Sequence, residues 1–188
     1  MSLKDSLKDI GLLIKAGKYD EAEQKVIAIE KAGNANTLIF LCGLRCATEN
    51  GKLSSALLYL QKVKEADPTN PEINKAECSV YEKFPEQITK DSLSIIDKVI
   101  ADEKISDARR ANLKKVKWST MIRLGLINEF RQLDDYSEAI KNVEICGQIV
   151  VASILDKKIS QEMVTAFYIC CVAISAKRDA GMNFLGNL

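Results

Sequence analysis

A step of 34 residues constrains this chain more than any other feature of its sequence. Three residues of the opening segment recur 34 positions later: Gly17, Tyr19 and Ala22 return as Gly51, Leu53 and Ala56. Apolar residues spaced three or four apart precede and follow each glycine, which predicts two helices in each step. Glycine at the end of a helix accepts the left-handed backbone conformation that other residues resist. The chain is therefore expected to begin with the same helical hairpin twice.

The residues of these turns resemble tetratricopeptide (TPR) repeats. GKYDEA at 17–22 and GKLSSA at 51–56 are similar to the turn inside a TPR hairpin. EADPTNP at 65–71 is similar to the turn between hairpins, where prolines stop one helix and start the next. The resemblance implies an all-α fold of TPR-like antiparallel helical hairpins, about nine helices, stacked as a right-handed solenoid.

Hydrophobic periodicity predicts the extent of each helix. We expect one helical-repeat domain over residues 1–188, with regular TPR-like hairpins at 1–84 and irregular longer helices at 85–188. The expected helices span 3–15, 19–32, 36–50, 53–66, 71–83, 89–102, 106–132, a stretch from the turn at 133–139 on to 155, and 159–177. The last is almost wholly apolar over 163–176 and is expected to be a buried or capping helix. A homodimer formed through this C-terminal helix is a further hypothesis.

The sequence departs from the TPR pattern at one place and repeats it at another. The small residue expected where paired helices cross falls at Gly43, one position early, and Leu44 takes the usual small site. Either the helix pairing is re-registered or the repeat frame slips there. Further on, LDDYSEA at 133–139 repeats the turn chemistry, with Tyr136 and Ala139 in the aromatic and small places.

The composition excludes most catalytic chemistry. The chain has no histidine, so Ser–His and Cys–His nucleophile pairs and His-containing metal sites are ruled out. Its six cysteines show no CxxC spacing, and the sequence has no glycine-rich phosphate loop and no nucleophile elbow. We therefore expect no enzymatic activity, no cofactor and no metal.

Charge and hydropathy bear on the compartment and the partners. The net charge of +1 gives no reason to expect a polyanion partner from the field of the whole chain. The start MSLKDSLKDIG lacks the character of a signal peptide, and no apolar run reaches membrane-spanning length. We expect a cytoplasmic protein, or a nuclear one, with reduced and mostly buried cysteines and no membrane partner.

The TPR resemblance also implies a binding surface. In TPR proteins the first helix of each hairpin lines the concave surface where peptides bind. We expect a non-catalytic scaffold or adaptor that binds a protein there, as a peptide segment or a complex subunit, through Lys4, Leu38, Leu41, Arg45, Glu49, Lys75, Ser79 and Glu82. One TPR subclass grips a C-terminal carboxylate with two Lys, two Asn and an Arg. Leu7, Gly11 and Cys42 occupy three of those positions here, so we expect that clamp to be absent.

A basic run from Lys104 to Arg123 supports an alternative function. Arg110, Lys114 and Lys117 fall at i, i+4 and i+7 and form one stripe along a helix. With Arg109, this stripe predicts an anion reader that binds phosphoprotein or RNA, although a nucleic acid partner is the less favoured expectation. The competing interpretation is a solvated helix face whose charges are balanced by acidic neighbours.

A narrower resemblance concerns the opening hairpins and DPTNPEINKAECSVYEKF at 67–84. Together they resemble the N-terminal region of the TPR scaffolds of Ski complexes, which assist cytoplasmic RNA decay. The residues that carry this resemblance do not go beyond the general TPR consensus. It implies a subunit of a protein complex, with this chain a part or a short relative of a longer repeat array.

Overall fold

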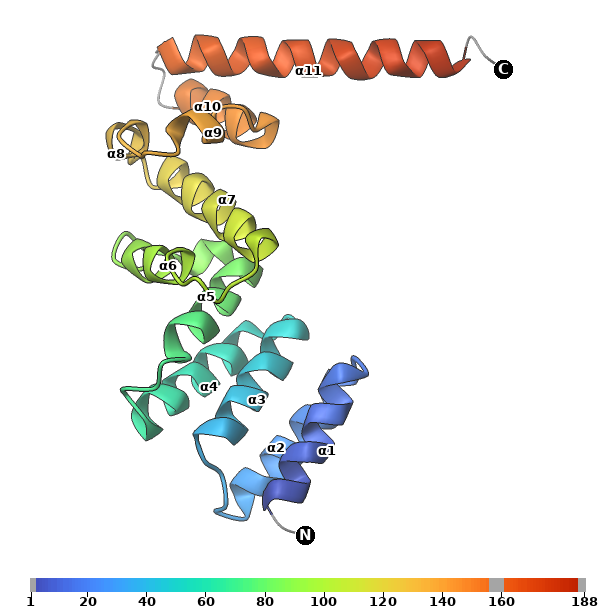
Figure 1. The fold of residues 1–188 in the computed structure, drawn as a ribbon, viewed down its shortest axis with the longest axis vertical. Coiled ribbons are helices and arrows are strands. Elements are labelled where there is room, and N and C mark those ends of the chain that lie inside the picture. The colour runs from blue at the N-terminus through green and yellow to red at the C-terminus, as the bar shows by residue number, and fades with distance from the viewer. Residues whose placement is uncertain (1–2, 156–160, 186–188) are drawn as a thin grey trace. The chain divides into compact units, whose positions relative to one another are not determined.

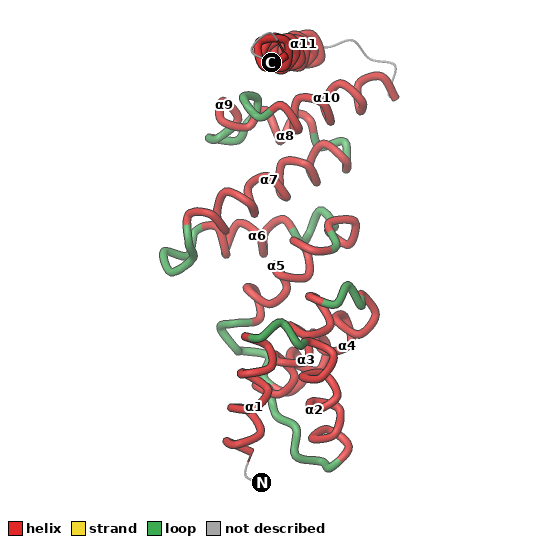
Figure 2. The backbone as a smooth tube through the Cα atoms, turned by 90° about the vertical axis from the view of Figure 1, so that its right-hand side faces the viewer, coloured by secondary structure: helices red, strands yellow, loops and turns green. Residues whose placement is uncertain are grey.

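The computed structural model describes residues 3–155 and 161–185. These residues form eleven α-helices, one short 3-10 helix and no strand, which confirms the prediction of an all-α fold (Figure 2). The helices outnumber the nine or so expected, because two of the long helices expected in the second half are each broken. Among the residues described, none of the helices combines the length and the apolar character needed to cross a membrane.

The chain divides into two compact units, residues 1–113 and 114–188. Helix α7, at Asp107–Arg123, begins in the first unit and ends in the second. The first unit also contains α1 (Leu3–Lys15), α2 (Tyr19–Lys31), α3 (Thr37–Glu49), α4 (Leu53–Ala66), α5 (Ile73–Lys83), the 3-10 helix η1 (Pro85–Gln87) and α6 (Leu93–Ile100). The second contains α8 (Ile127–Arg131), α9 (Tyr136–Ala139), α10 (Val143–Leu155) and α11 (Gln161–Leu185).

The two opening hairpins end their first helices with the same hydrogen bonds. Gly17 and Gly51 adopt φ values of 71° and 70°, in the left-handed region that favours glycine. The N–H of Lys18 donates to the carbonyl of Leu13, and 34 residues later the N–H of Lys52 donates to the carbonyl of Ala47, both at 2.9 Å. These bonds satisfy carbonyls that the helix end leaves open. The sequence repeat is therefore also a repeat of backbone geometry.

The hairpins pack through small and branched residues. Figure 1 shows α1 beside α2 and α3 beside α4, and α3 also packs against α2 and α5. Ala22 and Ala56 are fully buried, so neither holds its helix away from the partner. Ile10, Val26 and Ile39 are also fully buried, and each such side chain stabilises the fold by roughly 1.5–3 kcal/mol. The core of the first unit therefore lies between consecutive hairpins.

Gly43 marks the closest approach of α3 to α4. A Cβ atom built on Gly43 would lie 2.7 Å from the ring of Tyr59, whose side chain is only 4% exposed. No side chain fits at this position without moving that ring. In the structure Gly43 is thus the small residue at this helix crossing, as its position in the sequence suggested.

The expected long helix at 106–132 is wrong, because Gly125 breaks it. Gly125 adopts φ 71°, and the N–H of Leu126 donates to the carbonyl of Met121 at 2.9 Å, as at the ends of α1 and α3. The chain resumes as α8 two residues after the glycine, just as α2 and α4 do. The turn chemistry of the first two hairpins thus recurs at Gly125.

The expected continuous helix from the turn at 133–139 to Leu155 is also wrong. Helix α9 makes a single turn and ends at Ala139, which is fully buried. Asn142 then starts a new helix, because its side-chain oxygen accepts hydrogen bonds from the N–H groups of Glu144 and Ile145 at 3.0 and 3.3 Å. The segment at 133–139 has no glycine in the left-handed region, so it does not repeat the geometry of the Gly17 turn.

The last helix differs most from its expected environment. It runs over Gln161–Leu185 instead of 159–177, and it packs against α10 in the second unit. Ala166 is buried, but Val164, Phe167, Tyr168, Val172 and Ile174 are each at least half exposed. Within this chain α11 is therefore not a buried helix, since one neighbour covers one face only. The homodimer proposed through it stays a prediction.

Replacing Gly43 tests the close approach of α3 and α4. We expect Gly43→Ala to lower the free energy of unfolding by about 1–3 kcal/mol, because the added methyl group displaces the buried Tyr59 ring. Gly11→Ala in α1 is the matched control: a Cβ there meets no atom within 4 Å, so the variant should gain roughly 0.5–1 kcal/mol from better helix propensity. Urea denaturation followed by circular dichroism measures both, and equal stabilisation by the two substitutions would contradict the packing described.

Candidate functional site

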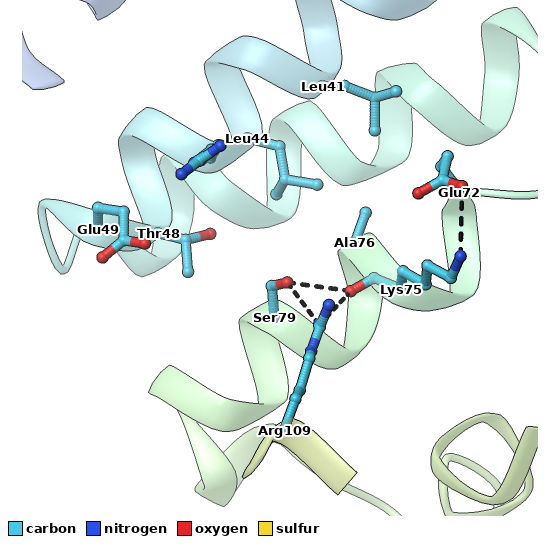
Figure 3. A pocket seen from close by; sticks show the side chains of 10 residues that line it. Leu41, Leu44, Thr48, Glu49, Glu72, Lys75, Ala76, Ser79 and Arg109 are labelled. Atoms are coloured by element: carbon cyan, nitrogen blue, oxygen red, sulfur yellow. Dashed lines mark hydrogen bonds and ion pairs between the residues drawn. The ribbon is translucent and has the colours of Figure 1, made fainter. Parts of the chain in front are cut away.

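A hollow of about 500 Å³ lies in the first unit between α3, α5 and the first turn of α7 (Figure 3). Helix α3 supplies an apolar and a charged wall, α5 supplies the facing wall, and α7 contributes one arginine. The lining residues are Leu41, Leu44, Arg45, Thr48, Glu49, Glu72, Lys75, Ala76, Ser79 and Arg109. A hollow of this size holds the side chains of a short peptide segment or a small ligand.

The hollow gathers most of the residues that the sequence suggested for partner binding. Five of them line it, namely Leu41, Arg45, Glu49, Lys75 and Ser79, and so does Arg109 from the alternative set. Glu82 does not line it but holds Arg109 at its edge. Leu38, on the first turn of α3, is 55% exposed and lies outside the lining, as does the exposed Lys4 on α1.

Helix α3 lies between the core and the surface, so one of its faces is buried and another faces the hollow. Asn36 caps its start by accepting a hydrogen bond from the N–H of Ile39 at 3.1 Å. Ile39 faces the core, whereas Arg45 and Glu49 are exposed at the hollow. Neither of these two charged side chains makes a hydrogen bond or an ion pair with any other residue in the described ranges. Two opposite charges are therefore available on one helix face.

The facing wall is held together by Arg109. One guanidinium nitrogen, Nη2, donates to the backbone carbonyl of Lys75 at 3.0 Å, to Oγ of Ser79 at 2.9 Å and to Oε2 of Glu82 at 3.1 Å (Figure 3 shows the first two). Asn112 donates to the other oxygen of Glu82 at 3.0 Å. The first turn of α7 is thus tied to α5, and the charge of Arg109 is balanced within the chain.

Lys75 is balanced in the same way. Its Nζ lies 2.9 Å from Oδ2 of Asp102 and 3.5 Å from Oε1 of Glu72. The hydrogen bond with Asp102 raises the pKa of Lys75. The hydrogen bond from the backbone N–H of Lys104 is the main cause that lowers the pKa of the Asp102 carboxyl. The hydrogen bond from the Lys75 side chain lowers it further. The two cations on this wall, Lys75 and Arg109, therefore stabilise the fold of the first unit.

Thr48 carries a polar group without a partner. Its side chain lines the hollow and is 6% exposed, and its hydroxyl has no hydrogen-bond partner among the described residues. A buried hydroxyl left without a partner costs about 1–3 kcal/mol, so such groups are uncommon in folded proteins. Thr48 was not among the predicted site residues, and neither were Leu44 and Ala76. The spacing of Leu44 and Thr48 from Leu41, at i+3 and i+7, is the signal that would have found them.

The basic stripe of the alternative function is engaged within the chain. Arg110 donates to the carbonyls of Ile100 and Asp102, the latter at 3.1 Å, and so closes the end of α6. In the second unit, Lys114 pairs with Glu138 at 2.8 Å and with Asp135 at 3.4 Å. The hydrogen bond that Lys114 donates to Glu138 is the main reason that the pKa of Lys114 is raised. Lys117 is half-buried. Acidic neighbours therefore balance part of the stripe, as the competing interpretation expected.

The six cysteines form no disulfide, and burial makes at least two of them poor nucleophiles. All six are free thiols, and no group of three potential metal ligands occurs in the described ranges. Burial raises the pKa of the Cys46 thiol and of the Cys78 thiol to about 12. Because the thiolate is the nucleophile, these two side chains act as small core residues.

Alkylation at pH 8 tests this burial. Raising a thiol pKa from 9.0 to about 12 lowers its thiolate fraction about a thousandfold, so iodoacetamide should label the exposed Cys171 long before Cys46 or Cys78. Peptide mass spectrometry gives the rate at each site, and labelling in 6 M guanidinium chloride, where all six should react alike, is the control. Labelling of Cys46 in the folded protein at the rate of Cys171 would show that α3 is not packed as described.

Comparison with known proteins does not assign this site. A scan against protein-family models found no match to the chain. No curated protein and no solved structure matches it either.

Proposed function

We propose that this chain is a non-catalytic interaction scaffold that binds a segment of a partner protein in the hollow between α3 and α5. The observation that carries the proposal is a group of side chains on α3 that no other described residue engages. Arg45 and Glu49 have no ion pair within the described residues, and the Thr48 hydroxyl beside them has no hydrogen-bond partner there. A ligand that satisfies all three would gain from each contact.

The repeat geometry of the first unit supports the same proposal. The hairpins α1–α2 and α3–α4 share their turn hydrogen bonds at a 34-residue offset. This recurrence favours a TPR-like stack, and we propose that it continues as a right-handed solenoid with the hollow on its concave side. A scaffold subunit of a protein complex, the role of the Ski-complex proteins that the opening hairpins resemble, suits such a surface. A cytoplasmic or nuclear site suits its six free thiols.

The chemistry of the hollow favours binding over catalysis. Ser79 is its only hydroxyl apart from Thr48, and its Oγ donates to the carbonyl of Lys75 at 3.0 Å while accepting from Arg109. Neither hydroxyl is hydrogen-bonded to a carboxylate or another general base within the described residues. The lysine and arginine of the facing wall are fixed by carboxylates. Such an arrangement recognises a shape and a charge pattern.

The alternative proposal, an anion reader along Lys104–Arg123, has less support. Its four named cations already interact within this chain: Arg109 with α5, Arg110 at the end of α6, Lys114 near α9, and the half-buried Lys117 as well. A phosphate would have to displace these contacts. Arg45, which has no ion pair within the described residues, lies in the hollow and outside this run.

Peptide display tests the proposed function. We expect a library of random twelve-residue peptides, panned on the full chain, to yield sequences that bind wild type and lose at least tenfold in affinity for the Leu41→Glu/Arg45→Glu variant. The substitutions remove an apolar contact and reverse the available cation, which together account for a tenfold change. Fluorescence polarisation with the selected peptides measures the affinities.

The control for this experiment carries the same kinds of change elsewhere. Leu12→Glu/Lys15→Glu alters an exposed leucine and an exposed cation on α1, outside the hollow. This variant should bind the selected peptides like wild type. The proposed function would be wrong if no peptide is enriched, or if the selected peptides bind the Leu41→Glu/Arg45→Glu variant, with an unchanged circular dichroism spectrum, as tightly as wild type.

Charge reversal separates the alternative function from the proposed one. We expect Arg110→Glu/Lys114→Glu/Lys117→Glu to lower the free energy of unfolding by roughly 2 kcal/mol, because α6 loses its cap and a third carboxylate joins Asp135 and Glu138. Binding of the selected peptides should persist in the folded fraction. A folded triple variant that loses those peptides, with wild-type binding that weakens steeply as salt rises, would favour the anion reader.

A further inference from the structure

Along the exposed face of α3, three residues form an ordered chemical pattern. Leu41, Arg45 and Glu49 lie four residues apart and all line the hollow, so the face offers an apolar, a positive and a negative group in that order. Four residues of α-helix rise about 6 Å, so each group is displaced from the next by about that distance. A ligand that lies along α3 meets these groups one after another.

Both charges are available to a ligand for a structural reason. Arg45 and Glu49 are an i,i+4 pair, but with the cation on the N-terminal side, the order in which such pairs are less favourable. They form no ion pair with each other or with any other residue of the described ranges. The remaining charges of the lining differ, since Lys75 is held by Asp102 and Glu72, and Arg109 by Glu82. The charge preference of the hollow therefore comes from α3.

The apolar end is shaped by three side chains. Leu41 faces the hollow beside Leu44, which is 2% exposed, and Ala76 of α5 lies opposite them (Figure 3). Because alanine is small, the space above it accepts an aliphatic side chain of the ligand. Complete burial of one such side chain would contribute roughly 1.5–3 kcal/mol to binding, before the costs of association are subtracted. This end therefore anchors the ligand, and the two charges orient it.

The spacing of the three groups on α3 favours an extended ligand. In an extended segment alternate side chains point to the same side and lie about 6.6 Å apart, close to the roughly 6 Å steps along α3. Successive side chains on one side of such a segment can therefore meet Leu41, Arg45 and Glu49 in order within this hollow of about 500 Å³.

We infer that the hollow selects an extended peptide segment of the pattern apolar–x–acidic–x–basic, with the acidic residue on Arg45 and the basic residue on Glu49. This inference rests on the proposed function and adds the chemistry of the partner to it. Thr48 lies on the next turn between the two charges. Rotation about its Cα–Cβ bond exchanges its methyl and hydroxyl groups, so the hydroxyl can reach a backbone amide of the segment.

The experiment compares two blocked peptides that differ only in charge order. The first is Gly-Leu-Ser-Glu-Ser-Lys-Gly and the second is Gly-Leu-Ser-Lys-Ser-Glu-Gly, each with a fluorescein label. The full chain should prefer the first by about tenfold in Kd, because two partly exposed attractions become two repulsions in the second. The charge-swap variant Arg45→Glu/Glu49→Arg should prefer the second by a similar factor.

A matched swap serves as the control. Lys18 and Glu21 form an exposed ion pair at 2.9 Å outside the hollow, and Lys18→Glu/Glu21→Lys keeps the net charge as the test swap does. This variant should keep the wild-type preference. If the test swap does not fold, Arg45→Gln and Glu49→Gln replace it, and each should reduce the preference to about threefold by removing one of the two pairs.

Each outcome bears on one of the two proposals. An inverted preference in the test swap alone supports the inference. Equal binding of both peptides to wild type, or a preference that the swap leaves unchanged, overturns it while the display result still decides the proposed function. Failure of both peptides to bind at 1 mM, when display peptides of another pattern do bind at Leu41 and Arg45, also overturns the inference and leaves the proposed function standing.

Discussion

Helix α3 packs into the core of the first unit with most of its surface and lines the hollow with the rest. The arrangement of the first unit depends on this double contact. It packs against α2, α4 and α5, so most of its circumference is covered. Gly43 lets α4 approach closely enough for the Tyr59 ring to lie on the α3 backbone, and Ile39 fills the core toward the preceding hairpin. One narrow face remains for solvent, and that face lines the hollow. The position of the candidate site follows from how tightly the rest of the helix is held.

Ion pairs between consecutive helices reinforce this packing. Lys52, after the turn that follows α3, reaches Glu23 of α2 at 2.7 Å, and Lys64 of α4 reaches Glu77 of α5 at the same distance. Both carboxylates are more than nine-tenths buried, and Glu77 also accepts a hydrogen bond from the Tyr81 hydroxyl at 2.6 Å. Removing one partner would leave a buried charge uncompensated, which is costly. Specific polar contacts therefore accompany the apolar core at each step of the stack.

The sequence predicted the first half of the fold well and the second half poorly, for identifiable reasons. Apolar periodicity and the glycines at 17 and 51 placed α1 to α4 within one residue at each end. Gly125 was overlooked because apolar residues continue on both sides of it, and Asn142 because a single capping side chain is a weak signal. The burial of Glu77 has no signal in the sequence, because it depends on contacts with Lys64 and Tyr81. Spacing along α3 indicated Leu41, Arg45 and Glu49, whereas the role of Arg109 depends on a contact 30 residues away in sequence, with Ser79.

The exposure of Arg45 and Glu49 has a consequence for how such a protein can change. Neither side chain supports another residue of the described chain, and both lie outside the core. Replacing them alters what the surface attracts and leaves the helix stack nearly untouched, since isolated surface substitutions usually change stability little. Under the proposed function, specificity and stability are thus encoded by different residues of one helix. New binding preferences could then accumulate at two codons without passing through an unfolded intermediate.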